Sequence, residues 1–72
     1  MKIIKGGKLI AELPDEPKDF DCTNKRGTIS IAILGVGDVK LGSYTPERAS
    51  EVMDALHDAY FANQAEFILL EE

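Results

Sequence analysis

The chain has 72 residues, 44% of them hydrophobic, and its 8 Lys and Arg face 13 Asp and Glu, a formal net charge of −5. Such a chain forms one domain, 1–72, and its apolar content argues against wholesale disorder. The acidic balance disfavours direct nucleic-acid binding, because contacts to phosphates rely on basic surface. The apolar runs are far shorter than the ~20 residues of a membrane helix and no secretory leader is evident, so we expect a cytoplasmic protein without membrane contact.

Two common ways of stabilising a small domain are missing from the sequence. A core of this size rarely supplies more than about 3 to 5 kcal/mol. Cys22 is the single cysteine and cannot close an intrachain disulfide, and no Cys and His residues have the spacing of a metal site. We therefore expect no cofactor, and we expect the chain to associate with itself as a homo-oligomer.

Two β-hairpins are predicted in the first two thirds of the chain. In the first, Gly6-Gly7 separates two short apolar stretches and supplies the positive φ angles that a two-residue turn needs. In the second, the β-branched segments 28–34 and 39–44 flank a glycine-rich break at 35–38.

An amphipathic helix is predicted from Pro46 to about Asn63. Thr45 suits the N-cap, and proline at the first helical position loses only a donor that has no partner there. At 100° per residue the apolar side chains fall on one stripe. That stripe consists of Ala49, Val52, Met53, Leu56, Ala59 and Tyr60. The apolar end of the chain, 66–72, is too short for a helix with a core face, so we predict a strand there.

Together these elements predict an α+β fold, an antiparallel sheet of about five short strands (ββ-ββ-α-β) with one amphipathic helix on one face. Segment 13–27 is long for a loop in so small a domain, so it is either functional or contains a short edge strand near Phe20 and Cys22. The expected core consists of Ile3, Leu9, Ile29, Ile31, Ile33, Val39, Leu41, Val52, Met53, Leu56, Tyr60, Phe67 and Leu69.

No set of residues in the sequence forms a convincing catalytic constellation. Residues 19–23 have the D-x-D-x-T form of the haloacid-dehalogenase phosphatases, but prolines and charges precede them where that chemistry needs a buried strand. His57 has no nucleophile at a suitable helical spacing, and nothing near Cys22 in the sequence lowers its pKa. We therefore expect a protein that is not an enzyme.

Exposed apolar side chains favour a contact surface instead. Strand 29–34 carries isoleucines on one face and Ala32 and Leu34 on the other, and segment 67–70 repeats this pattern, so both need cover on two faces. Phe61 lies opposite the core stripe of the helix, where an aromatic side chain is a candidate contact anchor.

The step from the second hairpin into the helix carries a sequence pattern of its own. Leu41, Gly42 and Tyr44, followed by Glu47-Arg48-Ala49 and Glu51-Val52, form the pattern LGxY…ERAxEV. This segment resembles one found in small uncharacterised proteins of phages and Gram-positive bacteria. The resemblance implies a phage-type accessory setting and gives no catalytic residues to transfer.

Two functional hypotheses follow. The first is a non-enzymatic acidic interaction protein, of phage type, that binds and inhibits or sequesters a host defence component. The residues expected to contact that protein are Asp15, Glu16, Asp19, Asp21 and Phe61. The alternative is a pocket between subunits for a small, nucleotide-like anionic ligand. The residues expected to contact its phosphates are Lys25, Arg26, Lys40 and Arg48.

Overall fold

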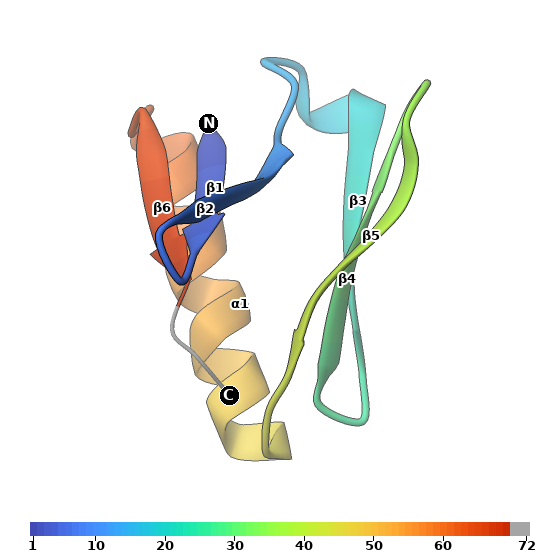
Figure 1. Ribbon diagram of the computed structural model, residues 1–72, viewed down its shortest axis with the longest axis vertical. Helices are drawn as coiled ribbons and strands as arrows, with labels where there is room; N and C mark the ends of the chain where they lie inside the picture. Colours follow the sequence, from blue (N-terminus) through green and yellow to red (C-terminus); the bar gives the residue numbers. More distant parts are fainter. Residues whose placement is uncertain (70–72) are drawn as a thin grey trace.

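The computed structural model describes residues 1–69 as six strands, one α-helix and one 3-10 helix (Figure 1). The elements in chain order are β1 (Lys2–Lys5), β2 (Lys8–Glu12), η1 (Pro17–Asp19), β3 (Phe20–Lys25), β4 (Thr28–Ile33), β5 (Gly37–Ser43), α1 (Pro46–Phe61) and β6 (Glu66–Leu69). Both predicted hairpins, the helix and the final strand are confirmed; residues 70–72 of that strand lie outside the described part. No helix within residues 1–69 is long and apolar enough to cross a membrane.

The α+β class is confirmed, but the single antiparallel sheet is wrong. The strands form two three-stranded sheets, ordered β2-β1-β6 and β3-β4-β5, and β6 runs parallel to β1. Helix α1 extends along the molecule and contacts strands of both sheets (Figure 1). The sheets separate because the prolines at 14 and 17 interrupt the chain between β2 and β3 and donate no backbone N–H to a ladder.

The core lies where the inner faces of the two sheets meet the apolar stripe of α1. Ile29 and Ile31 of β4 are fully buried, as are Ile3 of β1 and Leu56 of α1. Val39, Met53, Tyr60 and Phe67 are partly buried against this cluster. Two residues that the sequence did not mark as core also belong to it, Ala11 and Leu13, and so does Ala49 of the predicted helical stripe.

Leu9 is the clear error among the predicted core residues. Its side chain is 54% exposed, whereas Ala11 on the same strand is buried. A β-bulge between Ile3 and Ile4 pairs Ile3 with Ala11 on the inner face and Ile4 with Leu9 on the outer face. Because one extra residue reverses the facing of a strand, the bulge moves Leu9 to the outside.

The sequence left open whether segment 13–27 contains an edge strand; the structure places strand β3 there, six residues long. Strand β3 pairs antiparallel with β4 over its whole length, from Phe20 opposite Ile33 to Lys25 opposite Thr28. The two-residue turn between them, Arg26-Gly27, has positive φ at both positions (54° and 93°), as the tight hairpin turn demands.

The second face of β4 does not need the cover that the sequence suggested. It carries Thr28, Ser30 and Ala32, of which only Ala32 is apolar, and Leu34 lies in the turn after the strand, 76% exposed. Strand β6 does carry apolar side chains on both faces, as expected, because Leu69 is buried on one face while Ile68 is 62% exposed on the other.

Candidate functional site: an acidic pocket with an aromatic wall

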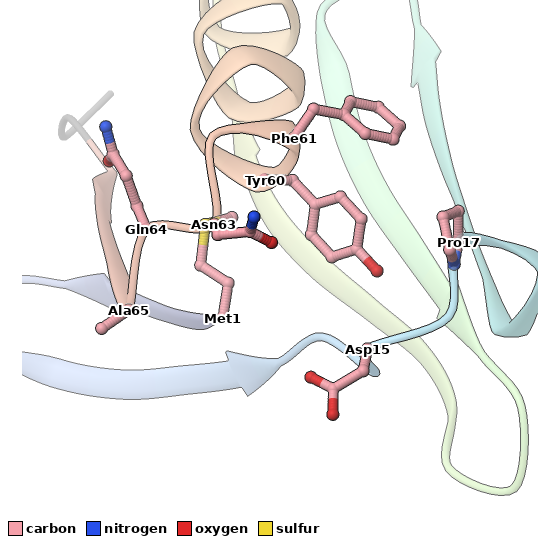
Figure 2. Close-up of a pocket in the computed structure, with 8 residues that line it drawn as sticks. All are labelled: Met1, Asp15, Pro17, Tyr60, Phe61, Asn63, Gln64 and Ala65. Carbon is pink, nitrogen blue, oxygen red and sulfur yellow. The ribbon is translucent and has the colours of Figure 1, made fainter.

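A pocket of about 440 Å³ lies where the end of α1 faces the loop between β2 and β3 (Figure 2). Tyr60 and Phe61 project from the last helical turn on the same side as the loop residues Asp15 and Pro17 (Figure 2). The complete lining is Met1, Asp15, Pro17, Tyr60, Phe61, Asn63, Gln64 and Ala65. The pocket therefore joins two of the residues predicted to bind a partner, Asp15 and Phe61.

The end of α1 fixes the aromatic wall. Asn63 adopts a left-handed backbone conformation with φ of 59°. Its N–H donates to the carbonyl oxygen of Tyr60 over 3.1 Å, and the N–H of Gln64 donates to that of Ala59 over 3.1 Å. This pair of bonds is the Schellman motif, which ends a helix at a defined residue. Tyr60 and Phe61 are thereby the last residues of a rigid turn.

The loop is held against this turn by Tyr60. Its hydroxyl donates a hydrogen bond to the carbonyl oxygen of Pro14 over 2.7 Å. Its ring stands edge-on to Phe20, with centroids 4.9 Å apart, and to Phe61, with centroids 5.3 Å apart. Edge-to-face pairs of this kind stabilise by about 0.5 to 1.5 kcal/mol beyond area burial. Phe61 remains 68% exposed, so its ring is available to a partner.

Negative charge gathers around the pocket. Partial burial raises the pKa of Tyr60, and the charges of Asp15, Glu16 and Asp19 raise this pKa further. Three carboxylates of one loop therefore lie close enough to raise the pKa of the same phenol. Lys18 is the single basic residue between them in the sequence. The carboxyl end of α1 adds the negative pole of the helix dipole, and its last turn carries no basic residue. Of the three carboxylates only Asp15 lines the pocket itself, and Met1 lines it as well, with its ammonium group donating to the carbonyl oxygen of Leu13 over 3.2 Å. The carboxylates therefore favour a cation on the side of the pocket that the loop forms.

Asp21, the fourth predicted carboxylate, lies apart from this pocket. It is exposed on β3, opposite Ala32. With Asp19 it borders a separate shallow hollow of about 310 Å³. Next to it, burial raises the pKa of Cys22 to about 11, and the charge of Asp21 contributes to the rise. The thiol is therefore protonated at neutral pH, and the side chain packs against the core.

The basic residues of the alternative hypothesis are not brought together within one protomer. Lys25 lines a hollow on the outer face of the β3-β4-β5 sheet, Lys40 one beside β1 and β2, and Arg48 a groove along α1. Arg26 lies in the turn after β3. Arg48 also forms an ion pair with Glu51 at 3.3 Å. An anion would therefore need a second copy to contact these residues jointly.

Sequence reasoning found part of the pocket and missed the rest. The helical pattern identified Phe61, and the unusual loop identified Asp15. Tyr60 was assigned to the core because it lies on the apolar stripe. At the end of the helix its ring packs against the core on one side, and its hydroxyl contacts the loop at Pro14. The signal for Asn63 was available, since asparagine after the last periodic residue is a common helix terminator.

The pocket is interpreted from its own residues. Comparison with known proteins gives no match to a family model, to a curated protein or to a solved structure. Within residues 1–69, no group of three or more His, Cys, Asp or Glu side chains is placed to hold a metal ion. His57 is exposed on α1. What the arrangement offers chemically is carboxylates, an exposed aromatic ring and a proline, which suit the binding of a cationic side chain.

Proposed function

We propose that this protein is a non-enzymatic interaction module whose acidic pocket binds a basic segment of a protein partner. The observation that carries the proposal is the carboxylate of Asp15 in the lining of a pocket that also holds the exposed ring of Phe61, with Glu16 and Asp19 on the same loop. A lone acidic loop would be an ordinary solvated surface. Here the hydrogen bond from Tyr60 to the carbonyl oxygen of Pro14 fixes the loop backbone directly before Asp15, so this part of the loop is positioned before a partner arrives.

A lysine or arginine side chain fits this chemistry. Its charged end can meet the carboxylate of Asp15 while its aliphatic stem packs on the rings of Pro17 and Phe61. A cation over an aromatic face gains about 0.5 to 1 kcal/mol when exposed and about 2 kcal/mol when desolvated. Charge complementarity of this kind mainly accelerates association and selects the partner.

The biological setting that we propose comes from the sequence resemblance: a phage-type accessory protein that binds and inhibits or sequesters a host defence component. The resembling segment itself lies away from the pocket. Leu41, Ala49 and Val52 are buried, and Thr45 accepts the N–H of Arg48 over 3.3 Å at the start of α1. These residues build the step from strand to helix, whereas the acidic loop supplies the proposed contact.

Binding of a fluorescein-labelled hexalysine peptide, followed by fluorescence anisotropy at low salt, tests the proposal. The triple variant Asp15→Asn, Glu16→Gln, Asp19→Asn, in the loop beside the pocket, is compared with a control, Asp38→Asn, Glu47→Gln, Asp54→Asn, that removes the same charge elsewhere in the chain. We expect the first variant to weaken binding at least about fivefold and the control to change it less than about twofold.

Phe61→Leu separates the aromatic contribution from charge. It keeps an apolar side chain and removes the ring, so we expect a further loss of about two- to fivefold in affinity. Equal weakening by the two triple variants would show that the peptide responds only to net charge. That result would overturn the pocket as the binding site.

A further inference from the structure

Strand β6 forms one free edge of the β2-β1-β6 sheet. Among the described strands it pairs only with β1, in parallel register from Lys2 opposite Glu66 to Lys5 opposite Leu69. The other sheet edges, β2, β3 and β5, each carry two or more charged residues, which discourage strand addition. In β6 the only charged residue is Glu66. This edge is therefore the least protected of the four.

The orientation of the backbone decides which groups this edge offers. The N–H of Lys2 donates to the carbonyl oxygen of Ala65 over 2.9 Å, so the carbonyl of Ala65 faces β1. In a regular parallel ladder, the N–H and C=O groups of every second residue point toward the same neighbouring strand. Glu66 and Ile68 therefore direct their N–H and C=O groups to the outer side. Such unpaired backbone groups are complementary to an extended strand.

An apolar groove follows the same edge. It has a volume of about 360 Å³ and lies between α1 and β6. Val52 and Ala55 form its helical wall together with Arg48 and Glu51, which pair with each other, and Phe67 and Ile68 form its strand wall. On the outer face of the sheet, Ile68 lies beside Ile4, which lies beside Leu9, so three large apolar side chains form one row. The edge thus has apolar surface on both faces.

We propose that β6 pairs antiparallel with β6 of a second copy about a two-fold axis at Phe67. This register joins residues 65–69 of both copies and uses the free groups of Glu66 and Ile68 as hydrogen-bonded pairs. The two Phe67 rings then lie opposite each other and extend into the grooves beside Val52 and Ala55. Aromatic pairs that lie directly opposite each other stabilise the pairing of neighbouring strands.

The charges of the strand fit this two-fold pairing. Glu66 of each copy lies opposite Ile68 of the other, so no like charges are directly opposite. Each Glu66 also has Lys2 of its own chain beside it on β1. The two Ile68 side chains become diagonal neighbours and join the two outer apolar rows. Because the paired segment is short, the interface is at the small end of known sizes, and we expect a micromolar or weaker dimer.

Hydrogen exchange measured by NMR on the full chain, across about 20 μM to 1 mM, tests this edge without any peptide ligand. We expect protection of the Glu66 and Ile68 amides to rise at least about fivefold with concentration, in parallel with dimer formation by sedimentation equilibrium. This readout does not depend on the acidic pocket, so its failure is distinct from that of the proposed function. A chain that stays monomeric at 1 mM, or a dimer without added protection of these two amides, would overturn the proposal.

Two substitutions and a control locate the contact. Ile68→Pro removes an outward donor while leaving the β1 side of the strand intact, a position where edge strands accept proline. We expect it to weaken the dimer at least about tenfold, with Ile68→Thr, which keeps the N–H, weakening it less. Leu9→Thr reduces the same outer apolar row away from the edge and should leave the dimer unchanged. Dissociation by Leu9→Thr alone would indicate stacking of sheet faces instead. If Ile68→Pro fails to fold, the exchange measurement and Ile68→Thr decide the question.

Discussion

The hydroxyl of Tyr60 donates to the carbonyl oxygen of Pro14 over 2.7 Å, which ties the last turn of α1 to a loop 46 residues earlier in the chain. This bond holds the acidic loop in place beside the helix. It also satisfies a partly buried backbone acceptor that would otherwise lose its partner on folding.

Tyr60→Phe should therefore loosen the loop while keeping the ring contacts with Phe20 and Phe61. We expect the free energy of unfolding to fall by about 1 to 2 kcal/mol, measured by urea denaturation, because one hydrogen bond is lost and its acceptor is left unsatisfied. Amide exchange in η1 should accelerate more than amide exchange in β4. A variant with unchanged stability and unchanged exchange would show that the hydroxyl does not hold the loop.

Alkaline pH should destabilise the fold through Cys22 and Tyr60. Burial raises the pKa of the Cys22 thiol from 9.0 to about 11 and also raises the pKa of Tyr60 above its ordinary 10.0. Both groups are neutral acids, so above pH 9 the unfolded chain loses protons first and the folded chain binds more of them. The contribution of Cys22 to stability is complete below pH 9 and is lost as the pH rises toward 11, and that of Tyr60 is lost as the pH rises above 10.

Urea midpoints at pH 8, 9.5 and 11 measure this loss. In Cys22→Ala the slope between pH 9 and 10 should be shallower than in the parent chain, since Tyr60 contributes mainly above pH 10. Alkylation of Cys22 by iodoacetamide should also be slow at pH 8 and rise up to about pH 11. A thiol that reacts at pH 8 as fast as a free cysteine would contradict the raised pKa.

The helix should be anchored by Leu56, whose side chain is completely buried. Leu56→Ala is expected to cost about 2 to 5 kcal/mol, through lost burial and the cavity left behind. Val36→Ala is the control, because Val36 is 72% exposed and its truncation should change stability by less than about 0.5 kcal/mol. Similar urea midpoints for the two variants would mean that the helix docks by another face.

Local signals account for the parts of this fold that the sequence predicts. Gly6-Gly7 and Thr45-Pro46 specify a turn and a helix start by their own backbone preferences, so both were recognisable without tertiary information. The division into two sheets was not, because it depends on which strands meet after the chain collapses. The parallel pairing of β6 with β1 joins the two ends of the chain, and no residue of either strand encodes that choice locally.

The same distinction explains the site. Phe61 was identified because a helical wheel needs only spacing, whereas the wall formed with Pro17 depends on how the loop folds back onto the helix. The bulge beside Ile3 is a second feature that residue spacing alone does not predict. Because β2 has one extra residue at the bulge, Ala11 is buried and Leu9 is exposed, although the larger apolar side chain of Leu9 would be expected in the core.

Gly27, in the turn between β3 and β4, is a position where any side chain should destabilise the fold. Gly27 has φ of 93°, and a Cβ there would overlap the carbonyl oxygen of Tyr44. Gly27→Ala should cost at least about 2 kcal/mol, from the left-handed backbone together with this overlap. Gly35→Ala is the matched control, because Gly35 has φ of 82° and open space around it, so only the backbone term of about 1 kcal/mol applies.

Arg26, the preceding residue of this turn, has φ of 54° and carries the same backbone strain without being glycine. Arg26→Asn creates the Asn-Gly pair that this turn type prefers, so we expect the free energy of unfolding to rise by up to about 1 kcal/mol. Thermal denaturation of Gly27→Ala, Gly35→Ala and Arg26→Asn measures the three effects on one scale. A loss for Gly27→Ala no larger than that for Gly35→Ala would show that the chain moves away from Tyr44 at little cost. A lower melting temperature for Arg26→Asn would mean that the arginine side chain stabilises the turn by more than its backbone strain.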